Sequence, residues 1–277
     1  MFEYFWKQQD DIPAGMGYPL FGASHLISVA ITLGLVILAA VLIRRMEVDG
    51  KRDSDDLRNK AIENNSNELR NYANTQRTGA YRKILRCIPI AMVLLELFKD
   101  GFLIKVGRFG IGYLPLHICS IGIFVFLLRE FVGAKDILGE IAVILIMPAS
   151  LAGLIFADWT ELYPVLNFIN LHSYLWHGLL ILYPLILLIS GEVKPSVRHS
   201  HWIILFLCVI VPPIYIFDKH FNCNYFFINW PVPDSPLEWM ASFMGNPGYL
   251  IGYVLLSMLT MLVVYLAIAT VQKHCRR

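Results

Sequence analysis

The amino-acid sequence predicts an all-α fold, namely a polytopic membrane helix bundle of about seven transmembrane helices. Hydrophobic residues make up 57% of the 277-residue chain and charged residues only 16%, against about 45–50% and about 25% in soluble domains. Several stretches also reach the roughly 20 mostly apolar residues that a helix needs to cross a bilayer. The composition excludes an ordinary soluble enzyme and a disordered protein. The net charge of +2 leaves no basic surplus for nucleic acid.

The first three windows of suitable length are 23–43, 84–103 and 110–128. The first contains no charged residue and is followed at once by Arg44 and Arg45. Three charged residues near its end interrupt the second window. We count all three as spans.

The last four windows are 137–156, 165–190, 202–217 and 248–270. All are apolar, but 202–217 is short and contains two adjacent prolines. Because this window is short and the second one is interrupted, six spans remain the alternative to seven.

The positions of lysine and arginine predict the orientation. Cytoplasmic segments carry an excess of both residues. Most of the 23 lysines and arginines fall on alternate segments, on the same side as the C-terminus, and the largest group lies between Arg44 and Arg86. We therefore expect the N-terminus outside and the C-terminus in the cytoplasm.

The chain reads as a single membrane domain, 1–277, with two distinctive connections. Segment 44–83 is polar, mixed in charge and rich in asparagine, which predicts a partly disordered cytoplasmic loop. Segment 218–247 combines aromatic residues with prolines. Because Trp and Tyr favour the membrane interface, this segment predicts a structured outer cap loop.

Ionisable residues inside the spans carry the functional argument, because such residues are rare in membranes and usually face the bundle interior or a wet cavity. The predicted topology places five of them in the outer half of the bilayer: His25, Glu96, His117, His172 and His177. We expect this clustering to mark a functional cavity.

Helical phase refines this picture. At about 100° per residue, window 165–190 carries one polar stripe, consisting of Asn167, Asn170, Tyr174 and His177. In the third span, Cys119 lies two positions from His117 and so almost opposite it, which argues against a Cys–His pair within that helix.

Structural explanations compete with functional ones. His177 could bond between helices, Glu96 could simply pair with Lys99, and Cys119 could be a packing residue. The chain contains no HExxH or zinc-type cysteine spacing. We therefore expect neither a metal nor a cofactor.

Three segments carry recognisable motifs. Residues 114–119 read LPLHIC, which resembles the LPxHxC signature of the YwaF family of bacterial integral membrane proteins. Residues 222–225 read NCNY and residues 245–249 read GNPGY, similar to its N-x-N-Y segment and the glycine–tyrosine segment before the last helix. His177 with Pro184 resembles its H…P helix. The resemblance implies a multi-pass protein of the bacterial cytoplasmic membrane.

This family is similar to a eukaryotic transmembrane acyltransferase that loads polyunsaturated chains onto ether phospholipids. Leu116 stands where the acyltransferase has its acyl-carrying cysteine, and Cys119 follows one helical turn later. By position, the resemblance carries over His117, His177, Asn222 and Asn224. It implies a partner that is a membrane lipid or an acyl-bearing small molecule.

The leading hypothesis is an intramembrane enzyme that transfers or hydrolyses a lipid acyl group. His177 would be the general base, and His117 and Glu96 would orient or polarise the reactants. The nucleophile stays open between Cys119, Ser120, Tyr174 and water. The residues expected to bind substrate are Asn170, Tyr174, Asn222, Asn224 and Tyr225, of which the two cap asparagines would donate to a carbonyl oxygen.

Two other hypotheses use the same residues. A binding or transport protein could use the same cavity, with helices broken at Pro212-Pro213 and at Lys99-Asp100. A membrane scaffold would need the histidines for stability only.

Overall fold

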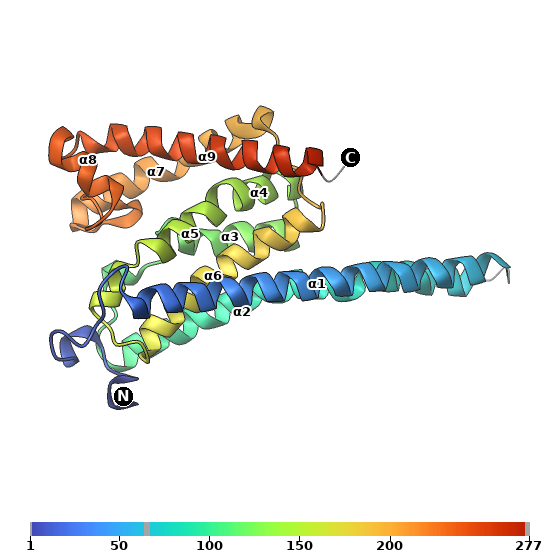
Figure 1. Cartoon of the computed structure of the whole chain (residues 1–277), viewed down its shortest axis with the longest axis horizontal. Coiled ribbons are helices and arrows are strands. Elements are labelled where there is room, and N and C mark those ends of the chain that lie inside the picture. The colour runs from blue at the N-terminus through green and yellow to red at the C-terminus, as the bar shows by residue number, and fades with distance from the viewer. Residues whose placement is uncertain (1, 64–66, 275–277) are drawn as a thin grey trace.

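The computed structural model describes residues 2–63 and 67–274, and over these residues it is helical, without strands (Figure 1). The α-helices are α1 (Ala23–Glu63), α2 (Asn67–Lys105), α3 (Ile118–Phe131), α4 (Lys135–Ile141), α5 (Met147–Ile155), α6 (Phe168–Ile189), α7 (Ser200–Phe221), α8 (Pro236–Met244) and α9 (Tyr249–His274). A π-helical turn, Ala142–Ile146, joins α4 to α5.

In the part of the chain that the structure describes, five helical segments are long and apolar enough to cross a membrane. They are Ala23–Lys60, Lys135–Glu161, Phe168–Ile189, Val197–Phe221 and Tyr249–His274. These segments overlap five of the seven windows and confirm a multi-pass membrane protein.

The other two windows lie in helices that differ from simple spans. Window 84–103 is the second half of α2 and carries its charged residues within the helix. In window 110–128, helix α3 begins only at Ile118. Leu114, the residue before Pro115, is extended (φ −62°, ψ 147°), as residues before proline tend to be, and His117 is also extended (φ −68°, ψ 152°) directly before the helix begins.

Helices α1 and α2 form an antiparallel hairpin that projects well beyond the rest of the chain (Figure 1). Segment 44–83 is therefore helical at its described residues, unlike the partly disordered loop that its composition predicts; residues 64–66 lie outside the description. Local ion pairs explain part of the helix, because the buried Glu47 carboxylate lies 2.6 Å from Arg44 and 2.5 Å from Lys51, at i,i+3 and i,i+4 spacings that support helices.

The central layer consists of α3, the α4–α5 helix and α6, with the α1–α2 hairpin on one side and α7 and α9 on the other (Figure 1). Its largest apolar core draws fully buried side chains from α2, α3, the π-helical turn and α6, including Leu85, Met92, Phe126, Ile144, Leu180 and Tyr183. Three smaller apolar clusters lie toward the end of the bundle that the N-terminal segment and segment 222–248 cover, among them one around Leu103, Tyr163 and Ile169 and one around Leu154, Tyr174 and Ile181.

Two caps close the same end of the bundle. The N-terminal segment 2–22 binds the start of α6, where Asn167 Nδ2 donates to the carbonyls of Tyr4 (2.8 Å) and Lys7 (2.9 Å). Segment 222–248, which includes α8, covers the ends of α7 and α9 (Figure 1). The sequence gives no sign of the N-terminal cap, and the outer location that it assigns to residues 218–247 stays a prediction.

Candidate functional site

His177 has a fixed ring and one nitrogen without a partner. Its Nδ1 lies 2.7 Å from the carbonyl of Ser173 and must donate to it. The ring stacks on the indole of Trp159, with centroids 5.2 Å apart and planes at 12°. In the neutral imidazole Nε2 is then an acceptor, and among the described residues no hydrogen bond engages it. A ring held in this way keeps one nitrogen that can accept a proton.

Helix α5 connects His177 to Cys119. A Cβ atom at Gly153 would lie 2.8 Å from His177 Nε2, so the imidazole lies directly against this glycine. Three residues earlier, the Ser150 hydroxyl interacts with the thiol of Cys119. Residues three apart share one face of a helix. His177 and Cys119 therefore lie against the same face of α5, at positions one turn apart.

His117 lies at the N-cap position of α3, where the extended chain enters the helix. Its ring packs against Tyr225 and Phe227, with centroids 4.9 and 5.3 Å away. No described residue bonds to either ring nitrogen. His117 is within electrostatic range of His177, so the structure brings these two predicted residues into one region.

Glu96 lies beside this region on α2 and is 8% exposed. Lys99 Nζ is 2.8 Å from the Glu96 carboxylate and 3.5 Å from that of Asp100. Lys99 in turn is within electrostatic range of His117 and His172. The pairing with Lys99 that the sequence suggests is present, and Lys99 also links Glu96 electrostatically to the histidine cluster, which consists of His117, His172 and His177.

His25 has a structural role instead. Its Nδ1 accepts from the N–H of Phe21 (3.1 Å), and its Nε2 donates to the carbonyl of Leu154 (2.9 Å). Both nitrogens are thus engaged, and the buried ring joins α1 to α5.

The polar stripe on α6 is used mainly to hold the N-terminal segment. The Tyr18 hydroxyl donates to Asn170 Oδ1 (3.0 Å) and lies 3.3 Å from the Tyr174 hydroxyl. Asn170 Nδ2 donates to the carbonyl of Val165 (2.9 Å). Of the two residues predicted to bind substrate, Asn170 is fully engaged and Tyr174 lies edge-on to Trp159.

The predicted cap residues have different surroundings. Asn224 Oδ1 accepts from the N–H groups of Asn229 (3.1 Å) and Trp230 (3.0 Å). Asn222 is exposed, in the left-handed conformation that ends α7 (φ 54°). Tyr225 is buried, and its hydroxyl donates to the carbonyl of Ile111. Of these three, only Tyr225 has a described contact with the histidine cluster.

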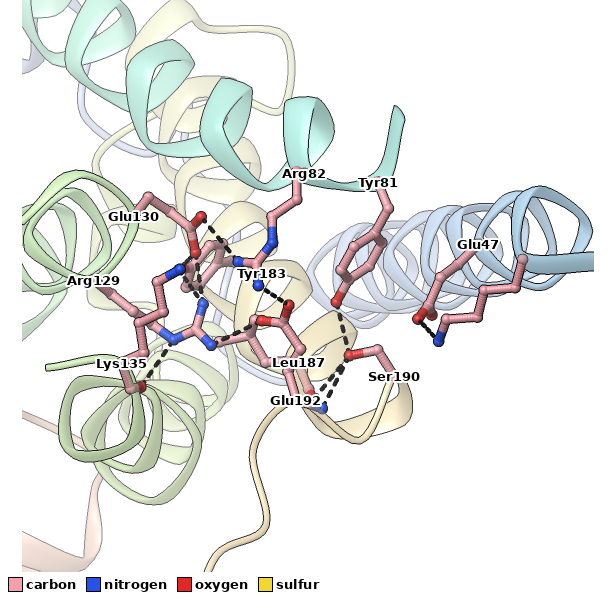
Figure 2. Close-up of polar contacts among 11 residues, drawn as sticks. Glu47, Tyr81, Arg82, Arg129, Glu130, Lys135, Tyr183, Leu187, Ser190 and Glu192 are labelled. Carbon is pink, nitrogen blue, oxygen red and sulfur yellow. Dashed lines mark hydrogen bonds and ion pairs between the residues drawn. The ribbon is translucent and has the colours of Figure 1, made fainter. Parts of the chain in front are cut away.

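Sequence reasoning missed a buried ion network at the opposite end of the bundle (Figure 2). Arg129 lies 2.6 Å from the Glu130 carboxylate and 2.9 Å from that of Glu192. Arg82 lies 2.8 Å from Glu192, and Tyr183 donates to Glu130 (2.8 Å). The network joins α2, α3, α6 and the loop after α6. The only sign of this network in the sequence is the adjacent pair of opposite charges, Arg129 and Glu130, at the end of window 110–128.

Beside this network, a cavity of about 310 Å³ is lined by residues that include Glu140, Glu192, Lys194 and His199. The Glu140 carboxylate accepts from the Tyr265 hydroxyl and lies 2.8 Å from His199 Nδ1. The Glu140 carboxylate therefore has hydrogen-bond partners on both of its oxygens. Among the described residues no group of three or more His, Cys, Asp or Glu side chains could hold a metal ion.

Comparisons with known proteins give one family. No curated protein and no solved structure matches the chain. A family model, described as the TMEM164 family, matches residues 20–265, which include the histidine cluster, the ion network and the whole of segment 222–248. The chain belongs to this family of membrane proteins.

Proposed function

We propose that this protein is a membrane enzyme that transfers or hydrolyses an acyl group of a lipid, with His177 as its general base. The observation that carries the proposal is the state of the His177 ring. Its Nδ1 is held by Ser173 and its plane by Trp159, while Nε2 has no partner among the described residues. A base oriented through its second nitrogen is the usual arrangement in nucleophilic catalysis.

Cys119 is the nucleophile that this geometry favours, since it contacts the same face of α5 as His177. His177 would take the thiol proton as sulfur attacks the ester carbonyl. The lipid alcohol would leave with that proton, and a thioester would remain on Cys119. A second alcohol or a water molecule would then attack the thioester carbonyl and give its proton to His177. The C–S bond breaks, the proton returns to the Cys119 sulfur, and the acyl chain leaves as a new ester (transfer) or as a fatty acid (hydrolysis). His117 and Glu96 would orient and polarise the reactants.

The proposal includes the seven-span topology, with the N-terminus outside and the C-terminus in the cytoplasm. In this arrangement α2 and α3 cross the membrane together with the five apolar segments, in a bacterial cytoplasmic membrane. The histidine cluster then lies in the outer half of the bilayer, on the same side as both caps. Ester carbonyls of lipids lie between the acyl chains and the headgroups, so a site below the outer interface would meet them.

The competing transport hypothesis relied on broken helices. Helix α7 is continuous through Pro212 and Pro213, and α2 is continuous through Lys99 and Asp100. Discontinuous helices are the feature that transporters use to build midplane sites. The continuous helices therefore favour the enzyme.

Lipid profiles of cells test the proposal. We would compare cells without the protein, cells overexpressing it and cells expressing His177→Asn, in which the amide can still donate to the Ser173 carbonyl. We expect overexpression to change acyl composition and His177→Asn to abolish the change. His201→Ala, at an exposed histidine of α7, is the matched control and should behave as the unmodified protein. Indistinguishable profiles for His177→Asn and the unmodified protein would overturn the proposal.

A further inference from the structure

The proposed reaction needs a hydrogen-bond donor for the carbonyl oxygen, on which negative charge develops when the nucleophile attacks. The sequence assigns this task to Asn222 and Asn224. In the structure the Asn224 amide is engaged with Asn229 and Trp230. Asn222 is exposed, and no described contact links it to His177. The donor must therefore come from elsewhere.

Trp159 offers such a donor. It lies in the short turn Asp158–Glu161 between α5 and α6. Its indole Nε1 is buried and has no hydrogen-bond partner among the described residues. Nearly all buried N–H groups in proteins are paired, and an unpaired one calls for an explanation. A donor that is kept free for a substrate is such an explanation.

The indole is also in the right place. It stacks on the His177 imidazole at 12°, so the indole lies in direct contact with the proposed base. The indole also packs against the ring of Tyr174, with the two ring centroids 5.9 Å apart and the ring planes at 74°. Tyr174 is fixed in turn by the hydroxyl of Tyr18. The indole is thus held by contacts from α6 and, through Tyr174, by the N-terminal segment.

Two other outer-half nitrogens are buried without partners, and both are less suitable. Gln8 Nε2 belongs to an amide whose oxygen is held by Tyr163, in the N-terminal segment. His172 Nε2 belongs to a ring that stacks on Trp176. His172 interacts with His177 only electrostatically, and Gln8 has no described interaction with it. The ring nitrogens of His117 are also without partners, but that ring packs against Tyr225 and Phe227. Among these unpaired groups, only Trp159 has a described ring contact with His177.

We propose that the Trp159 indole N–H donates a hydrogen bond to the carbonyl oxygen of the ester that the proposed reaction uses. The inference rests on the proposed function and names the substrate group that this site recognises. Through Trp159 the site would distinguish a carbonyl-linked chain from an ether-linked chain of the same length, because only the ester presents an acceptor of this kind.

The test uses the full chain, labelled with ¹⁵N-indole tryptophan, in detergent micelles. The indole signal of Trp159 is assigned among the six tryptophans by its loss in Trp159→Phe, or by elimination if that variant does not fold. Dioleoyl phosphatidylcholine is added in one sample and its dialkyl ether analogue in another. We expect a downfield shift of the Trp159 indole proton with the diester only. Equal spectra with both lipids would overturn the inference.

A second readout separates this inference from the proposed function. Trp159→Phe keeps the stacking ring and removes the N–H, so the cellular lipid change should fall by about 10²–10³-fold. Trp239→Phe, at an exposed tryptophan of α8, should leave it unchanged. If His177→Asn abolishes the lipid change while Trp159→Phe retains it, the inference fails and the proposed function stands. If His177→Asn has no effect, the proposed function itself fails.

Discussion

The imidazole of His177 rests on the backbone of Gly153, at a point where any Cβ atom would lie 2.8 Å from Nε2. That distance is shorter than van der Waals contact, so only glycine allows this position of the ring. The ring cannot retreat easily, because Trp159 stacks on it. The glycine therefore sets the position of the nitrogen that we assign as the base.

Gly153→Ala should displace the His177 ring and abolish the lipid change in cells, with a destabilisation of about 1–3 kcal/mol from overpacking. The lipid profile and detergent unfolding of the purified variant check both effects. Gly34→Ala is the control, because a Cβ at Gly34 in α1 meets nothing within 4 Å. An active Gly153→Ala variant would contradict the assigned position of the base.

Arg129→Met should destabilise the fold strongly. Arg129 is 2% exposed and neutralises both Glu130 and Glu192. Removing one partner of a buried ion network leaves an uncompensated charge and costs about 3–5 kcal/mol. SDS-induced unfolding in mixed micelles measures the loss. Arg198→Ala, at an exposed arginine of the following loop, should change stability by less than about 0.5 kcal/mol.

Asn224→Ala should reduce stability by about 1–3 kcal/mol, because it leaves the N–H groups of Asn229 and Trp230 without their acceptor. Asn222→Gly should be nearly neutral, since glycine adopts the positive φ of 54° without strain. Thermal unfolding compares the two variants. An Asn224→Ala variant with full stability and no activity would instead support the donor role that the sequence predicts.

Cysteine labelling tests the proposed orientation. Ser242→Cys in α8 and Val132→Cys after α3 both introduce a thiol at an exposed position. An impermeant maleimide should modify Ser242→Cys in intact cells and Val132→Cys only after permeabilisation, with the parent protein giving the background. The reverse pattern would place the histidine cluster in the inner half of the bilayer.

Sequence reasoning predicts the apolar spans well because a membrane helix needs a long apolar run, and such runs are visible in one dimension. It does not predict the helical hairpin. A polar segment such as 44–63 looks the same whether it is disordered or forms a helix against a partner. The late start of α3 is not visible either, because Leu114 and His117 have extended backbone inside a window whose average hydropathy is that of a span.

For the site, sequence position and helical phase place His177 and His117 in one region, but they do not predict what holds each ring. Trp159 contacts His177 from a turn outside the helix, so no periodicity links the two. Asn224 has a motif position that suggests chemistry, while its amide is used by the turn itself. Arg129 and Glu130 are assigned to a loop by sequence and become buried only through tertiary packing.

The most direct test of the account uses the purified protein in liposomes of a phospholipid that carries one isotope-labelled acyl ester chain. Mass spectrometry follows the labelled chain over time. The account predicts that the unmodified protein moves the chain to a second lipid or releases it as a fatty acid, and that His177→Asn does neither. A labelled chain that stays on its original lipid with the unmodified protein, or that moves equally with His177→Asn, would contradict the account.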